Sequence, residues 1–266
     1  MKRFFFYSQL YGAYLANTVK SRMAYRADFW VGFTANLMIQ LIGVLFITSL
    51  TARIPQIRGW GRHEILFIFG IAQAVFGLFN VLFTNLFELS GRYILEGGFD
   101  RVLLRPLGSY FQVVTERIDL EDLPGVLLGL LMAGYAAGKL HLDPTPGRVA
   151  LVALALANGC AIYAAVFTAL AGLTFWFRDR GSIASVVLML EGFARYPATI
   201  FGKWLQSVLT WVVPFAFAAF YPSAWLLRKP GSGTMVVLAP LAALAAALVA
   251  AAVWRRGVRR YESAGS

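Results

Sequence analysis

Hydrophobic residues form long stretches along the chain, separated by short polar or charged segments. A helix that crosses the hydrocarbon core of a bilayer needs about 20 mostly apolar residues. Six stretches predict membrane-spanning helices: 29–50, 65–87, 123–138, 149–177, 185–196 and 235–254. This pattern predicts an all-α polytopic membrane protein that folds as one transmembrane domain over residues 1–266.

The apolar region between residues 183 and 227 is too long for one helix and carries Glu191, Arg195 and Lys203. Two full crossings here would place the arginine-rich C-terminal end on the side opposite to the N-terminus. We therefore expect 185–196 to be the core of the fifth span and 197–227 to be a re-entrant segment. Irregular backbone at membrane depth must be covered by protein or water, so this segment should pack against the bundle or a partner chain.

Residues 1–27 predict an amphipathic helix that lies in the membrane interface. Its apolar and aromatic stripe has helical spacing, with Gln9, Lys20 and Arg22 set off from it. The stripe consists of Phe4, Tyr7, Tyr11, Tyr14, Leu15 and Val19. An ordinary packed N-terminal helix is the alternative. No small-residue cleavage site follows the first apolar run, so we expect no removed signal peptide.

The composition excludes a water-soluble domain. Hydrophobic residues make up 59% of the 266 residues and charged residues only 14%, whereas soluble domains carry about 45–50% and about 25%. The net charge of +11 comes from basic residues at the ends of apolar stretches, where they serve topology and lipid headgroups, so no nucleic acid partner is expected. A single cysteine, Cys160, excludes an intrachain disulfide and a cysteine-based metal site, and two histidines are too few for a histidine centre.

The positive charges predict that both termini are cytoplasmic. With six spans and a cytoplasmic N-terminus, fifteen of the 24 Lys and Arg residues lie inside and nine outside. The fifteen are Lys2, Arg3, Lys20, Arg22, Arg26, Arg92, Arg101, Arg105, Arg117, Arg178, Arg180, Arg255, Arg256, Arg259 and Arg260. Arg53, Arg58 and Arg62 depart from this bias, on the predicted outer side.

The longest hydrophilic segment, 88–122, contains a predicted short helix. Gly97 and Gly98 break the chain before it, Asp100 is in position for an N-cap, and Pro106 stops the helix. Such a helix presents apolar residues beside two arginines to the cytoplasm, and it is short enough to fit into a groove of another protein.

The motifs of enzymes that act in membranes are absent. The sequence contains no P-loop, no His-Glu-x-x-His, no Gly-x-Ser-x-Gly and no pair of carboxylates within one apolar span. An enzyme is therefore not expected, and the chain itself should hold no cofactor or metal.

Charged residues inside spans are costly and are candidates for function. Glu191 and Arg195 lie four residues apart, so they can pair on one helix face. Two interpretations stay open: a mutually neutralising structural pair, or a pair that lines a translocation path or gate.

Uncharged polar residues recur at helical spacing in the first two spans, where they either hold helices together or line a wet cavity. The candidate pathway or gate residues are Asn36, Gln40, Gln73, Asn80, Glu191, Arg195 and Tyr196. Phe69, Phe76 and Phe83 form an aromatic stripe in the second span, which is typical of packed or lipid-facing positions and would also suit a greasy or cationic substrate. The alanine-rich sixth span predicts close helix packing.

Two blocks of residues resemble the integral membrane subunits of type 2 ABC exporters, in the bacterial viologen-exporter-like or multidrug branch. The first runs from Gly97 to Gly108. The second comprises Gly192 to Pro197 and Ile200 to Gly202, followed by Val213-Pro214 and Tyr221-Pro222.

The resemblance implies a separate ABC ATPase subunit, in two copies, that holds ATP and Mg²⁺. It implies a second permease, either the same chain or a homologue, and a coupling helix in the loop 88–122 that contacts the ATPase. The coupling residues would be Asp100, Arg101, Val102, Leu103, Leu104, Arg105 and Pro106, with Arg101 and Arg105 as charged contacts and Val102 to Leu104 as buried ones.

We therefore expect an ATP-driven exporter permease of the bacterial inner membrane for an amphiphilic or drug-like substrate. A membrane subunit with a sensing or assembly role, without transport of its own, is the alternative.

Overall fold

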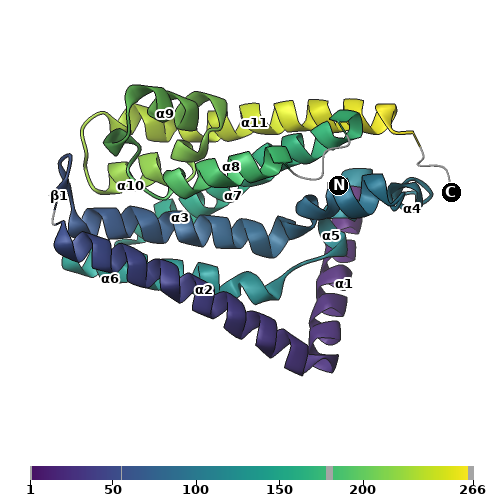
Figure 1. Ribbon diagram of the computed structural model, residues 1–266, viewed down its shortest axis with the longest axis horizontal. Helices are drawn as coiled ribbons and strands as arrows, with labels where there is room; N and C mark the ends of the chain where they lie inside the picture. The colour runs from purple at the N-terminus through teal and green to yellow at the C-terminus, as the bar shows by residue number, and fades with distance from the viewer. Residues whose placement is uncertain (1, 55, 178–181, 263–266) are drawn as a thin grey trace.

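The computed structural model describes residues 2–54, 56–177 and 182–262, and these residues are almost entirely helical (Figure 1). Five helices are long and apolar enough to cross a membrane, or up to six if one bent pair counts as a span. The five are α2 (Arg26–Arg53), α3 with its continuation (Arg62–Leu95), η3 with α6 (Leu120–Lys139), α7 (Pro146–Phe177) and α11 (Ser232–Arg260). The prediction of an all-α polytopic membrane protein is confirmed.

Shorter elements connect and cover these helices. Strands β1 (Gln56–Ile57) and β2 (Trp60–Gly61) pair in a small antiparallel hairpin between α2 and α3. The remaining elements are α1 (Lys2–Ala24), α3 (Arg62–Phe83), η1 (Thr84–Glu88), η2 (Leu89–Leu95), α4 (Phe99–Leu103), α5 (Ser109–Glu116), η3 (Leu120–Asp122), α6 (Leu123–Lys139), α8 (Ser182–Ala194), η4 (Ala198–Ile200), α9 (Lys203–Ser207), η5 (Val208–Val212), η6 (Phe215–Phe217) and α10 (Phe220–Leu226).

Helix α3 is the most buried of the long helices, and its backbone touches that of α6. A Cβ atom added at Gly70 would lie 2.6 Å from the amide nitrogen of Ala133, and one added at Gly129 would lie 2.5 Å from that of Ala74. Lipid tails are as apolar as leucine, so helices in a bilayer gain from close backbone packing between small residues. Glycine is therefore required at both crossings.

The helix of the second span continues further than the apolar stretch 65–87 predicted. It passes through a 3₁₀ turn and a π turn to Leu95, which shortens the predicted loop 88–122 at its start. The cause is the burial of Leu89, Tyr93 and Ile94, whose spacing keeps them on the side that faces the bundle.

Helix α1 lies across one end of the bundle, at a steep angle to α2 (Figure 1). The Tyr7 ring packs edge-on against Phe111 of α5, at 4.8 Å between centroids, and the Tyr7 hydroxyl accepts a hydrogen bond from the Gly108 amide at 3.2 Å. Tyr14 also contacts Phe111, whereas Val19 is exposed. Tyr7 and Tyr14 thus dock α1 on α5, and Arg22 near the end of the helix is ion-paired with Asp119 and Glu121.

The region after α7 does not form a simple fifth span. Helix α8 has 13 residues, too few to cross a bilayer alone, and the basic turn at Arg178 and Arg180 lies outside the described residues. Helical segments Lys203–Val212 and Phe215–Leu226 are bent by 77° at Val213-Pro214. They lie at the end of the bundle opposite to α4 and next to the start of α11 (Figure 1). A bend of this kind occurs in a broken span or in a re-entrant loop, and we call residues 197–227 the re-entrant segment.

We expect Gly70→Leu to lower the thermal stability of the purified protein, because the side chain would force α3 and α6 apart. Overpacking of this kind costs about 1–3 kcal/mol. Gly43→Leu on α2 is the matched control, since a Cβ there meets no atom within 4 Å. Thermal unfolding in detergent measures the difference; equal melting temperatures for the two variants would contradict the proposed backbone contact.

Candidate functional site

A short helix, α4, stands at one end of the bundle, the end at which α1 begins and α11 finishes (Figure 1). It begins after Gly97, whose φ of 71° is in the left-handed region that favours glycine. Gly98 occupies the N-cap position, so the expected Asp100 cap is wrong. Asp100 lies inside the first turn instead, where the helix dipole favours a negative charge.

The exposed residues of α4 and the turn after it combine charge with apolar surface. Arg101 and Arg105 are exposed, as is Pro106. Leu103 is 49% exposed and Leu104 is 85% exposed. Val102, by contrast, is only 5% exposed and belongs to the core of this chain, so it is not available to a partner as the sequence suggested.

Helix α4 is fixed to the ends of α7 and α11 by one buried aromatic ring. Phe99 is fully buried, and its ring centroid lies 5.1 Å from that of Phe175 on α7 and 5.0 Å from that of Tyr261 after α11. Trp254 on α11 completes the cluster at 6.4 Å. Helix α4 is therefore packed directly against two long helices. Nothing in the local sequence pattern marks Phe99 as an anchor.

The backbone after α4 is held by a buried glutamine. Gln112 on α5 donates hydrogen bonds of 2.9 Å to the carbonyl oxygens of Val102 and Leu107. Ser109, the first residue of α5, accepts a hydrogen bond of 3.2 Å from Trp254 Nε1. Helices α4 and α5 thus form one unit with the end of α11.

Tyr261 follows α11 and lies near the charge of Asp100 on α4. Burial and this neighbouring carboxylate raise the pKa of Tyr261 to about 12.

A second feature lies inside the bundle, where five of the predicted pathway residues form a hydrogen-bonded series with one further residue. We call this series the polar chain. In order, its members are Asp122, Asn36, Gln40, Gln73, Arg195 and Glu191. Its members come from α2, α3, η3, α8 and the residue that follows α8, so it joins segments that are distant in sequence.

The α2 and α3 members lie near the middle of their helices. Asn36 donates to Asp122, and its own carbonyl accepts from Gln40 Nε2 at 3.3 Å. Gln40 Oε1 accepts from Gln73 Nε2 at 2.5 Å. Asp122 was not among the candidate residues predicted from the sequence.

Arg195 links Gln73 to Glu191, the last member of the polar chain, through three hydrogen bonds. Its Nε and Nη2 donate to the two carboxylate oxygens of Glu191, at 2.9 and 3.0 Å, and its Nη1 donates to Gln73 Oε1 at 2.7 Å. The guanidinium also lies 5.5 Å from the ring centre of Phe76. Glu191 is 3% exposed, so the two charges compensate each other within the protein.

Two of the predicted pathway residues lie outside the polar chain. Asn80 is half-buried, and no side-chain hydrogen bond of Asn80 is found among the described residues. Tyr196 packs against Phe69 instead, with ring centroids 6.0 Å apart. Helical spacing alone therefore does not decide which of the predicted residues belong to the polar chain.

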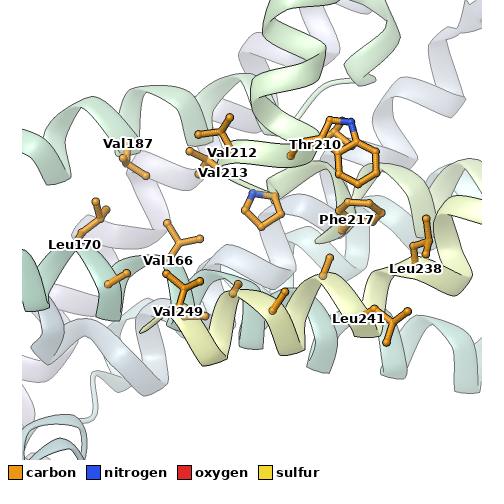
Figure 2. A pocket seen from close by; sticks show the side chains of 17 residues that line it. Val166, Leu170, Val187, Thr210, Val212, Val213, Phe217, Leu238, Leu241 and Val249 are labelled. Atoms are coloured by element: carbon orange, nitrogen blue, oxygen red, sulfur yellow. The ribbon is translucent and has the colours of Figure 1, made fainter. Parts of the chain in front are cut away.

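A cavity of about 500 Å³ opens between α7, α8, the re-entrant segment and α11 (Figure 2). Val166 of α7, Val187 of α8 and Phe217 of the re-entrant segment point into it. Thr210 contributes a polar side chain, and its hydroxyl is hydrogen-bonded to the Gln206 carbonyl at 2.7 Å.

The small residues of α11 serve two faces. Ala239, Ala243 and Ala250 are buried, and α11 runs along α7 as the alanine pattern predicted. Ala242, Ala245 and Ala246 line the cavity instead. The alanine pattern predicted only packing for this helix and gave no sign of the cavity.

Comparison with known proteins identifies one family. A family model described as ABC-2 family transporter protein matches residues 37–265, which is most of the chain. No curated protein and no solved structure matches. Within the described residues, no group of three or more His, Cys, Asp or Glu side chains could hold a metal ion.

We expect Arg195→Met to destabilise the protein strongly, because it leaves Glu191 buried without its cation. Removing one partner of a buried ion pair costs about 3–5 kcal/mol. The double variant Glu191→Leu with Arg195→Met removes both charges and should recover most of this loss. Thermal unfolding of the purified variants tests the pair, and a double variant no more stable than the single one would contradict it.

Proposed function

Because the chain belongs to the ABC-2 family of transporter proteins, and is thus a membrane permease subunit of an ABC transporter, we propose that it is the export permease for an amphiphilic or drug-like substrate. A separate ATPase subunit, in two copies, holds ATP and Mg²⁺ and supplies the energy. A second permease, the same chain or a homologue, completes the translocation path.

The exposed surface of α4 carries this proposal. Leu103 and Leu104 are apolar side chains exposed at the end of the bundle, beside Arg101 and Arg105. An apolar pair flanked by cations suits a groove with an acidic rim on another protein. This arrangement supports the assignment of α4 as the coupling helix that contacts the ATPase.

The anchoring of α4 supports a mechanism. Closure of the ATPase dimer would push α4, and Phe99 would pass the movement to Phe175 on α7 and to Trp254 on α11. Helices α7 and α11 form two walls of the apolar cavity. Such a push changes the transport cycle only if the ATPase binds the two arrangements with different affinity.

The apolar cavity supports the substrate class. Its lining of valine, leucine, alanine and aromatic side chains suits the hydrophobic part of an amphiphile. The exposed face of α2, which includes Ile39, Ile42 and Phe46, is left for lipid or for the second permease. We propose further that α4 and both termini face the cytoplasm, in a bacterial inner membrane.

We expect the double variant Arg101→Glu with Arg105→Glu to uncouple ATP hydrolysis from transport. Placing like charges against an acidic groove costs several kcal/mol, so permease-stimulated ATP turnover should fall at least about tenfold. The measurement uses the reconstituted complex, with ethidium as the transported probe.

The matched control is Lys20→Glu with Arg26→Glu, which makes the same change in charge at exposed positions of α1 and α2. It should keep wild-type turnover. Wild-type turnover together with normal ATPase binding in the Arg101 and Arg105 variant would refute the coupling role. Normal ATPase binding with no ATP-dependent movement of any solute by the wild type would favour the sensing or assembly role.

A further inference from the structure

The end of the bundle opposite to α4 is strongly basic. Eight Lys and Arg residues of the described chain lie there, against two carboxylates, Glu64 and Asp143. The eight are Arg53, Arg58, Arg62, Lys139, Arg148, Lys203, Arg228 and Lys229. The family assignment and the coupling mechanism give no role to this charge.

Part of the charge surrounds a cavity of about 460 Å³ at the start of α11, lined by Arg148, Arg228 and Lys229. Lys229 is ion-paired with Glu64 at 2.7 Å. No carboxylate of the described residues lies within ion-pair distance of Arg148 or Arg228, and the Arg148 guanidinium donates a hydrogen bond to the Asp143 backbone carbonyl, at 2.9 Å. Two cations are therefore available to an anion.

The start of α11 adds to this positive field. Ser232 and Gly233, which open this 29-residue helix, line the same cavity. The Ser232 amide donates to the Lys229 carbonyl at 3.4 Å; the amides that follow it in the first turn have no partner within the helix and favour an anion. Trp225, which is partly exposed, also lines the cavity, as tryptophan does at the level of lipid headgroups.

An apolar groove adjoins this cavity, and Arg148 and Leu226 line both. The groove has a volume of about 220 Å³ and runs between α3, α6 and α7, with Asp143 and Arg148 as its charged lining residues. It reaches Ile71, nine residues along α3 from Arg62, which is about 13 Å into the bundle at 1.5 Å per residue.

We propose that the basic cavity and the groove together bind one anionic phospholipid, with its phosphate between Arg148 and Arg228 and part of an acyl chain in the groove. A cationic headgroup site that continues into an apolar groove at membrane depth matches a charged head joined to a hydrocarbon tail. A soluble anion would use the cavity and leave the groove empty. This lipid site is independent of the transport role.

Native mass spectrometry tests whether the basic cavity prefers an anionic headgroup. The full chain is purified in a neutral detergent, and phosphatidylglycerol or phosphatidylcholine is added. Phosphatidylglycerol should bind more tightly. Arg148→Gln with Arg228→Gln should weaken its binding about thirty-fold, the equivalent of about 2 kcal/mol for two basic residues. Arg53→Gln, at the same end but outside the cavity, should leave binding unchanged.

The groove is tested by Gly134→Leu, which places a side chain in open space within it. This variant should also weaken phosphatidylglycerol binding. Gly138→Leu on the same helix is the control, since its position is equally open and does not line the groove. The groove variant keeps the proposal testable if the arginine variant fails to fold.

Three results would overturn the lipid site. The first is equal binding of the two lipids. The second is phosphatidylglycerol binding that neither the arginine variant nor Gly134→Leu weakens in folded protein. The third is displacement of bound phosphatidylglycerol by millimolar inorganic phosphate, which would assign the cavity to a soluble anion.

Discussion

The need to satisfy polar groups inside a bilayer decides how the central helices of this protein meet. Arg195 contacts Gln73 near the middle of α3, one of the helices long enough to cross a bilayer, and an unpaired charge inside a bilayer is costly. Both carboxylate oxygens of Glu191 and the amide oxygen of Gln73 accept its hydrogen bonds, and Gln73 in turn donates to Gln40. The register of α2, α3 and α8 follows from this series, because a shift of one helix would leave several buried polar groups without partners.

Two parts of the bundle differ in how closely their helices pack. On one side, α3 and α6 are in backbone contact through Gly70 and Gly129. On the other side, α7, α8, the re-entrant segment and α11 leave an apolar cavity between them (Figure 2). Helix α4 is fixed to this second half through Phe99. In the proposed mechanism, a push on α4 is thus transmitted to the helices that line the cavity.

Sequence reasoning predicted the features that depend on local pattern. Runs of apolar residues located the long helices, and the glycines and proline around 97–106 located α4. The remaining features depend on which helices become neighbours. Gln73 and Asn80 have equivalent spacing on α3, yet only Gln73 has α2 and α8 beside it. Phe99 and Asp122 looked like loop residues, and the cavity needs walls from four parts of the chain.

Site-specific photo-crosslinking tests most directly the central claim that α4 couples the permease to an ATPase. A photoreactive amino acid would replace Leu104 on the exposed surface of α4 or, in a second variant, Trp204 at the opposite end, which is 77% exposed. Crosslinked partners in native membranes would be identified by mass spectrometry. The account predicts a P-loop ATPase attached at position 104 and none at 204; an ATPase attached only at 204, or at neither position in a complex that retains it, would contradict the account.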